Sequence, residues 1–137
     1  MSAIGLVDTG PLVAVLDRAD RHHAWATRTL SQLDAPLHTC EAVLSEAWFL
    51  LGRARGGRPA LLGVLEAGWV VVPAGLADES KRVWQLMKKY ADQPMSVADA
   101  CLVRLAELAP RATLVTLDRD FLVYRRGRSP LRLATPF

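Results

Sequence analysis

Four acidic residues are the part of this sequence best suited to chemistry. Asp8 and Asp118 each follow a short apolar run that is typical of a buried strand, whereas Glu46 and Asp99 lie in segments with helical periodicity. Carboxylates brought to one place repel one another unless a cation neutralises them. Oxygen ligands without histidine or cysteine favour hard cations, so we expect Mg²⁺ or Mn²⁺ at a site built from these four acids.

Glu46 is the acid whose position is hardest to explain without a partner. Val43, Ala47 and Leu50 are its neighbours on one apolar helix stripe, so the pattern predicts a glutamate that points toward the buried side. A buried carboxylate needs a cation or donors. The alternative is that Glu46 lies at the edge of the stripe and its carboxylate reaches water.

The three aspartates have structural explanations as well. Ser96 and Asp99 have the spacing of a capping box, and an acid in the first helical turn also complements the helix dipole. Asp118 can cap the short helix that follows it, and Asp8 can form an Asx turn before Gly10. Taken singly, each acid could be structural, and only their joint placement favours a metal site.

The elements that must position these acids alternate along the chain. Hydrophobic periodicity and turn residues predict strands at 4–7, 37–39, 69–72, 113–116 and 131–134, the last as an edge strand. They predict helices at 11–16, 21–33, 41–51, 77–90 and 97–108, and another that starts at Pro59 after a basic loop at 53–57.

Strands that alternate with helices predict an α/β fold with right-handed crossovers. We expect three layers, with a central, mainly parallel sheet of four to five strands flanked by helices, and one domain over residues 1–137. Ligands of such folds bind beyond the carboxyl ends of the strands. Asp8 and Asp118 follow two strands at that end, which is where the metal site is predicted.

Composition excludes several classes of protein. A chain of 137 residues, half of them hydrophobic, can bury a core of its own and is not typical of disordered or fibrous chains. Cys40 and Cys101 lie in apolar runs without zinc-ligand spacing, so we expect reduced core thiols. Neither a secretory signal nor an apolar stretch long enough to span a bilayer is found, so a cytoplasmic protein is predicted.

The charge distribution points to a phosphate-bearing partner. The formal net charge is +3, and only three of the 17 basic residues, at 81, 88 and 89, are lysines. Arginine suits bidentate phosphate contact, although solvated arginines that serve solubility explain the charge equally well. The candidate phosphate contacts near the acids, a weaker hypothesis than the acids themselves, are Arg53, Arg55, Arg119, Arg125, Arg126 and Arg128.

Two other functions built on a strand-end aspartate do not fit this sequence. A phosphatase of the haloacid dehalogenase type would need a second aspartate at Gly10. A receiver domain would need a lysine at the end of a late strand, but all three lysines belong to one predicted helix.

Four short segments that contain the acids resemble the motifs of one family in order and spacing. They are 7–12 (VDTGPL), 43–46 (VLSE), 95–100 (MSVADA) and 116–121 (TLDRDF). Together they resemble the acidic motifs of the PIN domain, and most nearly those of VapC-type toxins of bacterial toxin–antitoxin pairs. The resemblance runs from about residue 4 to residue 121. Each motif is weak alone, but the ordered set is specific.

The resemblance implies a Mg²⁺- or Mn²⁺-dependent endoribonuclease that acts on RNA, forms a homodimer and is inhibited by a small antitoxin. By position, the metal-site acids would be Asp8, Glu46, Asp99 and Asp118. Thr116 would order the site and Asp120 would be an auxiliary acid. Many relatives have an acid at the position of Ser96, so this chain lacks one possible accessory carboxylate but keeps the four principal acids.

Two alternatives remain within the resemblance. The first is a housekeeping PIN nuclease outside any toxin–antitoxin pair. The second is a PIN-like domain that binds RNA or protein without cutting, but four mutually repelling acids would have no purpose in a binder.

Overall fold

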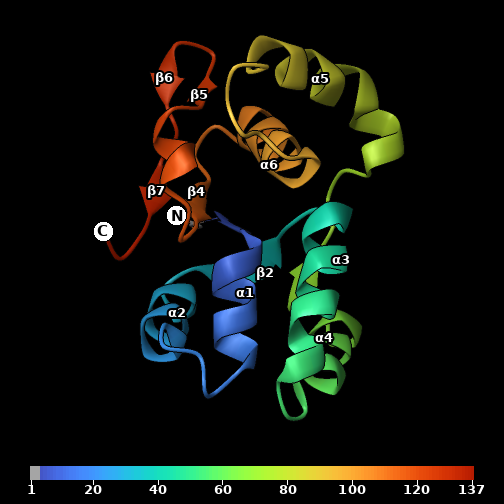
Figure 1. The fold of residues 1–137 in the computed structure, drawn as a ribbon, viewed down its shortest axis with the longest axis vertical. Helices are drawn as coiled ribbons and strands as arrows, with labels where there is room; N and C mark the ends of the chain where they lie inside the picture. The colour runs from blue at the N-terminus through green and yellow to red at the C-terminus, as the bar shows by residue number, and fades with distance from the viewer. Residues whose placement is uncertain (1–3) are drawn as a thin grey trace.

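The computed structural model describes residues 4–137 and has an alternating α/β architecture (Figure 1). Its strands are β1 Ile4–Val7, β2 Asp34–His38, β3 Val70–Val71, β4 Thr113–Val115, β5 Arg125–Arg126, β6 Ser129–Pro130 and β7 Leu133–Ala134. Its α-helices are α1 Thr9–Leu16, α2 His23–Ser31, α3 Glu41–Leu50, α4 Gly57–Glu66, α5 Leu76–Lys89 and α6 Val97–Leu108. Two 3₁₀ turns, η1 Leu51–Arg53 and η2 Arg119–Leu122, complete the order.

Five strands form one sheet in the order β3-β2-β1-β4-β7, and every pair in it is parallel. The predicted parallel sheet of four to five strands is confirmed, including the edge strand near residue 133. The chain moves from β1 outward to β3 and then returns to place β4 on the other side of β1. This reversal between β1 and β4 is the topological switch point, where α/β folds bind their ligands.

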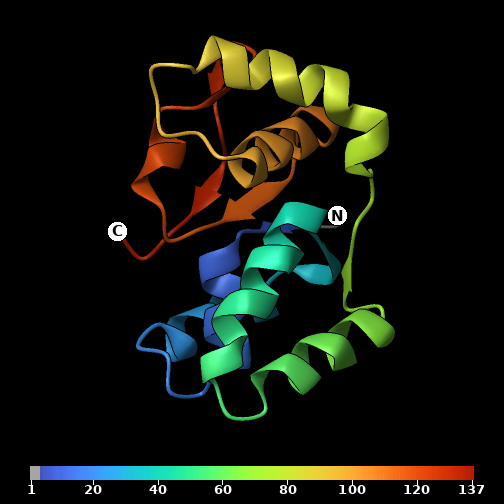
Figure 2. The same cartoon turned by 45° about the vertical axis from the view of Figure 1, so that its right-hand side comes forward.

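The helices cover both faces of this sheet. In Figure 1, α1 to α4 lie below the strands as drawn and α5 and α6 lie above them, and the turned view in Figure 2 keeps the same division. Right-handed crossovers account for it, because connections that run toward β3 and the connection that returns to β4 must pass on opposite faces. Helix α5 packs on α6, which in turn contacts β1 and β4.

The core explains why the central strands read as continuous apolar runs. Leu6 and Val7 of β1 and Leu114 and Val115 of β4 are buried, since helices cover the sheet on both sides. Both cysteines are buried free thiols, as predicted.

The C-terminal segment differs from the sequence prediction. Strands β5 and β6 form a small antiparallel hairpin that was not predicted, and they pair Arg125 with Pro130 and Arg126 with Ser129. Gly127 has a φ of 61° in the turn, a conformation that glycine adopts without the strain of a side chain. The hairpin was not predicted because strands of two residues are too short to show an alternation of apolar and polar side chains.

Strand β2 begins earlier than predicted. The sequence 34–36, Asp-Ala-Pro, predicts a break before a strand that starts at residue 37, but Asp34 already pairs with Ile4 of β1. The register between β1 and β2 shifts between the pairs Ile4–Asp34 and Leu6–His38, so Pro36 lies in an irregular stretch of this ladder. Proline is tolerated at such a bulge because no regular ladder hydrogen bond depends on its missing N–H.

Within residues 4–137 no helix combines the length and apolar character that crossing a bilayer requires.

Candidate active site

The four predicted acids line one open cleft at the carboxyl end of the sheet, about 660 Å³ in volume. We call it the acidic cleft. Its lining residues are Asp8, Thr9, Gly10, Glu46, Leu50, Pro94, Ser96, Asp99, Leu117, Asp118 and Arg119. They come from the start of α1, the middle and end of α3, the start of α6 and the turn after β4. The cleft therefore lies at the switch point, where the alternation of elements predicted it.

Asp8 ends β1 and caps α1. It is only 8% exposed, its Oδ1 accepts the Thr9 backbone N–H at 2.8 Å, and its Oδ2 accepts the Thr116 hydroxyl at 2.7 Å. Burial raises the pKa of Asp8 to about 6, against the opposing effect of these two hydrogen bonds. The negative charges of Asp99 and Asp118 raise this pKa further. Asp8 thus lies where ionisation is costly without a cation.

Thr116 connects two of the acids. Its buried hydroxyl donates to Asp8 and accepts the backbone N–H of Asp118 at 3.0 Å. Asp118 in turn caps η2, since its Oδ1 accepts the backbone N–H of Asp120 at 2.9 Å. One hydroxyl therefore fixes the Asp8 carboxylate relative to the turn that presents Asp118. Asp120 is half-buried and does not line the acidic cleft.

Asp99 forms the predicted capping box at the start of α6. Its Oδ2 accepts the Ser96 backbone N–H at 3.2 Å, and its own N–H donates to Ser96 Oγ at 3.0 Å. Asp99 is 7% exposed, and burial raises its pKa although the hydrogen bonds from Ser96 oppose the shift. Capping and a place in the cleft are not alternatives here, because the cap occupies Oδ2 and no hydrogen bond from the described residues reaches Oδ1.

Glu46 differs from the prediction that it points inward. Val43 and Ala47 are buried, but Leu50 is 44% exposed and Glu46 itself is exposed. The buried stripe of α3 is narrower than the apolar pattern suggested, because the exposed side of the helix also carries apolar residues. The reach-to-water alternative is therefore the one found, although Glu46 still borders the acidic cleft.

The predicted phosphate-binding arginines do not share one location. Only Arg119 lines the acidic cleft. Arg53 and Arg55 line a separate hollow of about 730 Å³, which we call the arginine hollow. Its lining residues are Leu16, Asp17, Arg18, Ala19, Arg53, Ala54, Arg55, Gly56 and Ala60. Arg125 and Arg126 lie in β5, and Arg128 lies in the hairpin turn.

A divalent cation fits the donors of the acidic cleft. Asp8 and Asp99 are buried carboxylates, and neither has an ion pair with a basic side chain among residues 4–137. The Thr9 hydroxyl oxygen beside them is also buried, and within the described part of the chain it has no hydrogen-bond partner. Among the described residues, no group of three or more His, Cys, Asp or Glu side chains lies close enough together to hold a metal ion. The two buried carboxylates, Asp8 and Asp99, match Mg²⁺, which usually takes one or two carboxylates and keeps several waters.

Two polar groups at the site were not found from the sequence. Thr9 follows Asp8 in the motif, but no pattern indicated that its hydroxyl would be buried. Tyr124 donates its hydroxyl to Asp99 Oδ2 at 3.4 Å. It lies 25 residues from Asp99 in a segment whose structure was not predicted, so only the fold brings the two together.

A five-stranded parallel sheet with aspartates gathered at its switch point defines a PIN-like α/β protein. Comparison with known proteins agrees: residues 5–127 match the family described as PIN domain. A relative, Ribonuclease VapC26 of Mycobacterium tuberculosis, is 31% identical over 118 residues, which cover 83% of this chain and 86% of the relative. The chain belongs to the PIN domain family, and its resemblance to VapC-type ribonucleases is confirmed.

A solved structure has the same fold. VapC20 of Mycobacterium tuberculosis, described as a sarcin-ricin loop cleaving toxin, matches with a TM-score of 0.74 at 23% identity. The match covers 85% of this chain and 91% of VapC20. The predicted three-layer architecture is confirmed by this likeness.

Proposed function

We propose that this protein is a divalent-metal-dependent endoribonuclease and the toxin of a toxin–antitoxin pair. The observation that carries the proposal is the acidic cleft at the switch point, which all four acids of the PIN motifs line. Two of them, Asp8 and Asp99, are buried without a basic partner among the described residues. The ribonuclease name of the VapC26 relative supports RNA as the substrate.

The role proposed for each acid follows from how deeply its side chain is buried. Asp8 and Asp99 would hold Mg²⁺ or Mn²⁺ directly, and the more accessible Asp118 and Glu46 would complete the site, directly or through water. Thr116 would keep the Asp8 carboxylate in place through its 2.7 Å hydrogen bond. When bound, the cation supplies positive charge that offsets the phosphodiester and makes water a better nucleophile.

The reaction is the hydrolysis of a phosphodiester bond. Water adds its oxygen to phosphorus, the bond from phosphorus to one ribose oxygen breaks, and that oxygen leaves as a hydroxyl after taking up a proton. The protein binds and orients the phosphate against the acids. Arg119 is the basic side chain of the cleft lining and is placed to contact an adjacent phosphate.

The decisive experiment is an RNA cleavage assay with Mg²⁺ or Mn²⁺, with and without a chelator. Asp8→Asn and Asp99→Asn should each abolish cleavage while the melting transition remains, because each removes a charge that the cation needs. Glu66→Gln, an exposed acid of α4, is the matched control and should cleave like the parent. Cleavage that survives chelation, or that either aspartate variant retains in full, would contradict the proposal.

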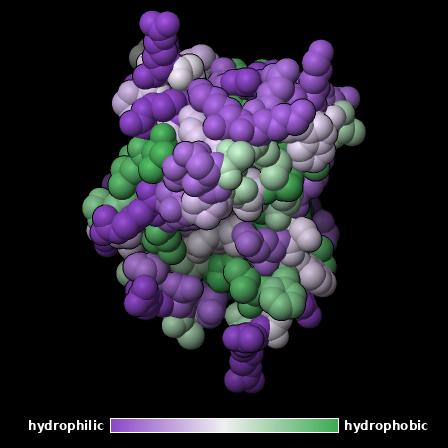
Figure 3. Space-filling model, turned by 45° about the horizontal axis from the view of Figure 1, so that its top comes forward, coloured by the Kyte–Doolittle hydropathy of each residue, from purple (hydrophilic) through white to green (hydrophobic). Residues whose placement is uncertain are grey.

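An exposed apolar surface beside the cleft supports a protein partner. Trp48, Phe49 and Leu50 at the end of α3 are all exposed, with Phe49 at 72%, and Leu50 also lines the acidic cleft. Figure 3 shows apolar patches among hydrophilic side chains on the face that it presents. Contiguous exposed apolar side chains typically mark an interaction site. A small antitoxin bound over the end of α3 would cover one edge of the cleft and block RNA.

The partner proposal is tested by co-purification with the product of the adjacent reading frame. Phe49→Ser should weaken that complex and relieve inhibition of cleavage, whereas Leu62→Ser, at another exposed apolar position on α4, is the control and should do neither. If the free protein instead changes from dimer to monomer with Phe49→Ser in sedimentation velocity, the surface belongs to the expected homodimer rather than to the antitoxin.

A further inference from the structure

The only two tyrosines of the chain lie side by side behind the acidic cleft. The rings of Tyr90 and Tyr124 pack edge to face with centroids 5.1 Å apart, and Tyr124 makes a second edge contact with Phe121 at 5.4 Å. Tyr124 is fully buried and Tyr90 nearly so. These contacts fix the Tyr124 ring, because rotation would break two aromatic contacts at once.

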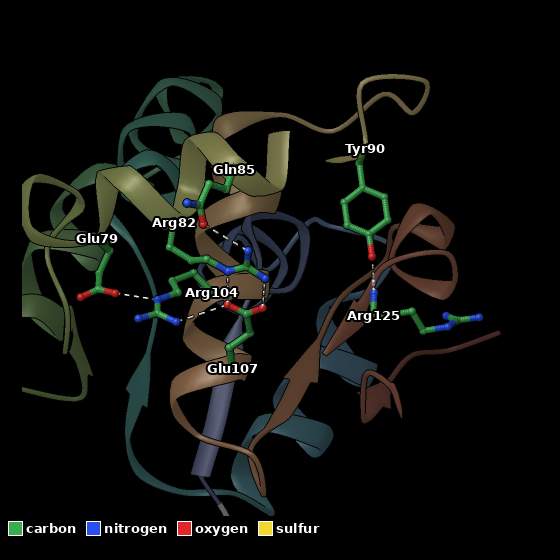
Figure 4. A network of polar contacts seen from close by, with 7 residues as sticks. All are labelled: Glu79, Arg82, Gln85, Tyr90, Arg104, Glu107 and Arg125. Atoms are coloured by element: carbon green, nitrogen blue, oxygen red, sulfur yellow. Dashed lines mark hydrogen bonds and ion pairs between the residues drawn. The ribbon is translucent and has the colours of Figure 1, made fainter. Parts of the chain in front are cut away.

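The two hydroxyls have different partners. Tyr124 donates to Asp99 Oδ2 at 3.4 Å. The Tyr90 oxygen instead accepts the backbone N–H of Arg125 at 2.9 Å (Figure 4). The Tyr90 hydroxyl therefore provides a hydrogen-bond acceptor for the backbone of β5. Tyr124 instead reaches one of the two buried acids of the site from a ring held rigidly in the core.

We propose that Tyr124 is a positioning residue that holds Asp99 in the orientation needed to bind a divalent cation. The proposal rests on the proposed function in that Asp99 serves as a cation ligand. The Ser96 backbone N–H and the Tyr124 hydroxyl both donate to Oδ2, so the carboxylate is held through one oxygen. The other oxygen, Oδ1, is left for a ligand.

The physical benefit is preorganisation. A carboxylate held at one oxygen loses little rotational freedom when its second oxygen binds a cation, so the hydrogen bond strengthens cation binding without touching the cation. A purely structural role would be different. The hydroxyl would then serve only to satisfy a buried polar group, and its removal would affect stability but not the affinity of Asp99 for metal.

The test compares two variants that each lose one buried tyrosine hydroxyl. Mn²⁺ binding to the RNA-free protein is measured by calorimetry for the parent, Tyr124→Phe and Tyr90→Phe. Tyr124→Phe should weaken Mn²⁺ binding roughly threefold to tenfold, the range for loss of one ordinary hydrogen bond, because at 3.4 Å the bond to the carboxylate is long. Tyr90→Phe should bind Mn²⁺ like the parent. Equal affinities in the two variants, or a parent that binds no Mn²⁺, would overturn the inference.

RNA cleavage by the same proteins separates this inference from the proposed function. A parent that binds Mn²⁺ but leaves RNA intact would refute the nuclease proposal, while the difference between the two variants would still support Tyr124 as a positioning residue. If the parent cleaves and Tyr124→Phe binds Mn²⁺ and cleaves like Tyr90→Phe, the function stands and the inference fails.

A spectroscopic measurement on the unmodified chain does not depend on the folding of Tyr124→Phe. Protein labelled with ¹³C at the tyrosine ζ carbon should give two signals, because the chain has two tyrosines. Tyr90→Phe assigns them. Added Mg²⁺ should shift the Tyr124 signal and leave the Tyr90 signal in place. A shift of neither signal, or of the Tyr90 signal alone, would overturn the inference.

Discussion

Asp8 shows how one residue of the site affects the whole fold. It is held by Thr9 and Thr116 in a buried position beside two other acids. Burial raises its pKa to about 6, from a value of 3.8 in an unfolded chain. A structural carboxylate would have no reason to be kept where its charge is this unfavourable, whereas a cation ligand would. The cost of burying this charge should be measurable as a loss of stability in the metal-free protein.

We predict that Asp8→Asn stabilises the metal-free protein at neutral pH. Because the folded pKa lies above the unfolded one, the folded state binds the proton more tightly, so the parent loses stability as the pH rises from about 4 to about 6. Asn cannot ionise and avoids this loss, which amounts to about 3 kcal/mol for a shift of this size. The stability of the variant relative to the parent should therefore grow across this window and stay constant above it.

Urea unfolding at a series of pH values, in chelator, measures this difference. Asp92→Asn, at an exposed position in the turn before α6, is the control for replacing an aspartate by asparagine. With Mn²⁺ added, the parent should gain stability and Asp8→Asn should not. An Asp8→Asn variant less stable than the parent at pH 7.5 in chelator would contradict the prediction.

The sequence predicted the position of the four acids in the fold better than it predicted the burial of each side chain. Motif order and the strand ends brought all four to one cleft, because parallel strands deliver their carboxyl ends to the same edge. Asp99 and Ser96 formed the predicted capping box. The inward direction of Glu46 was wrong, since helical periodicity cannot distinguish a core-facing stripe from an exposed apolar surface.

At the scale of elements, α6 must be held still because its first turn carries Asp99. A network of ion pairs between α5 and α6 contributes to this (Figure 4). Arg82 donates to both oxygens of Glu107 at 2.9 and 2.6 Å, and Arg104 donates to Glu79 at 2.6 Å and to Glu107 at 3.3 Å. Glu107 is the acid that both arginines share, and its side chain is only 13% exposed.

We predict that Glu107→Gln destabilises the fold by about 1–2 kcal/mol at neutral pH, since two partly exposed arginines lose their shared charge. Burial alone would raise the pKa of Glu107, but the hydrogen bonds and charges of Arg82 and Arg104 lower it below the ordinary value of 4.5. This stabilisation is therefore present above pH 4.5 and is lost as the pH falls through the lower folded value.

Denaturant unfolding of parent and Glu107→Gln between pH 3 and pH 7 checks both the size and the sign. The difference should shrink toward acid pH and at high salt. Glu66→Gln, at an exposed site on α4, is the control and should change stability little. A Glu107→Gln variant as stable as the parent at pH 7 would show that packing alone holds α5 against α6.

The elements predicted well are those with a strong period or a buried core. Helix α6 was predicted with both ends correct, and β1 and β4 were found within one residue because helices cover them on both faces. The β5–β6 hairpin was missed because its strands are two residues long and rich in arginine. Strands this short show no hydrophobic alternation from which their pairing could be predicted.

At the scale of the whole molecule, the acidic cleft and the arginine hollow lie at the two ends of α1. The acidic cleft lies at its first residues, and the arginine hollow lies beyond its last residue. The eight residues of α1 span about 12 Å. Arg18, Arg53 and Arg55 are exposed in that hollow against a single aspartate, Asp17. We propose that an RNA strand held at the acids extends along α1, so that phosphates away from the scissile one meet these arginines.

We predict that Arg53→Ala/Arg55→Ala weakens RNA binding and makes it less sensitive to salt, while the bond that is cut stays the same. Each phosphate contact on a single strand contributes about 0.7 to the slope of log affinity against log salt, so losing two should flatten the slope by about 1.4.

RNA binding is measured in the Asp8→Asn background, where the strand is not cut. Arg28→Ala/Lys88→Ala removes two exposed charges from other faces and is matched in net charge. If RNA were attracted only by overall charge, both double variants would change the slope alike; a change confined to Arg53 and Arg55 would instead mean that phosphates contact the hollow directly. Equal slopes in the two variants would therefore contradict an RNA path along α1, even in a protein whose acids cut RNA as proposed.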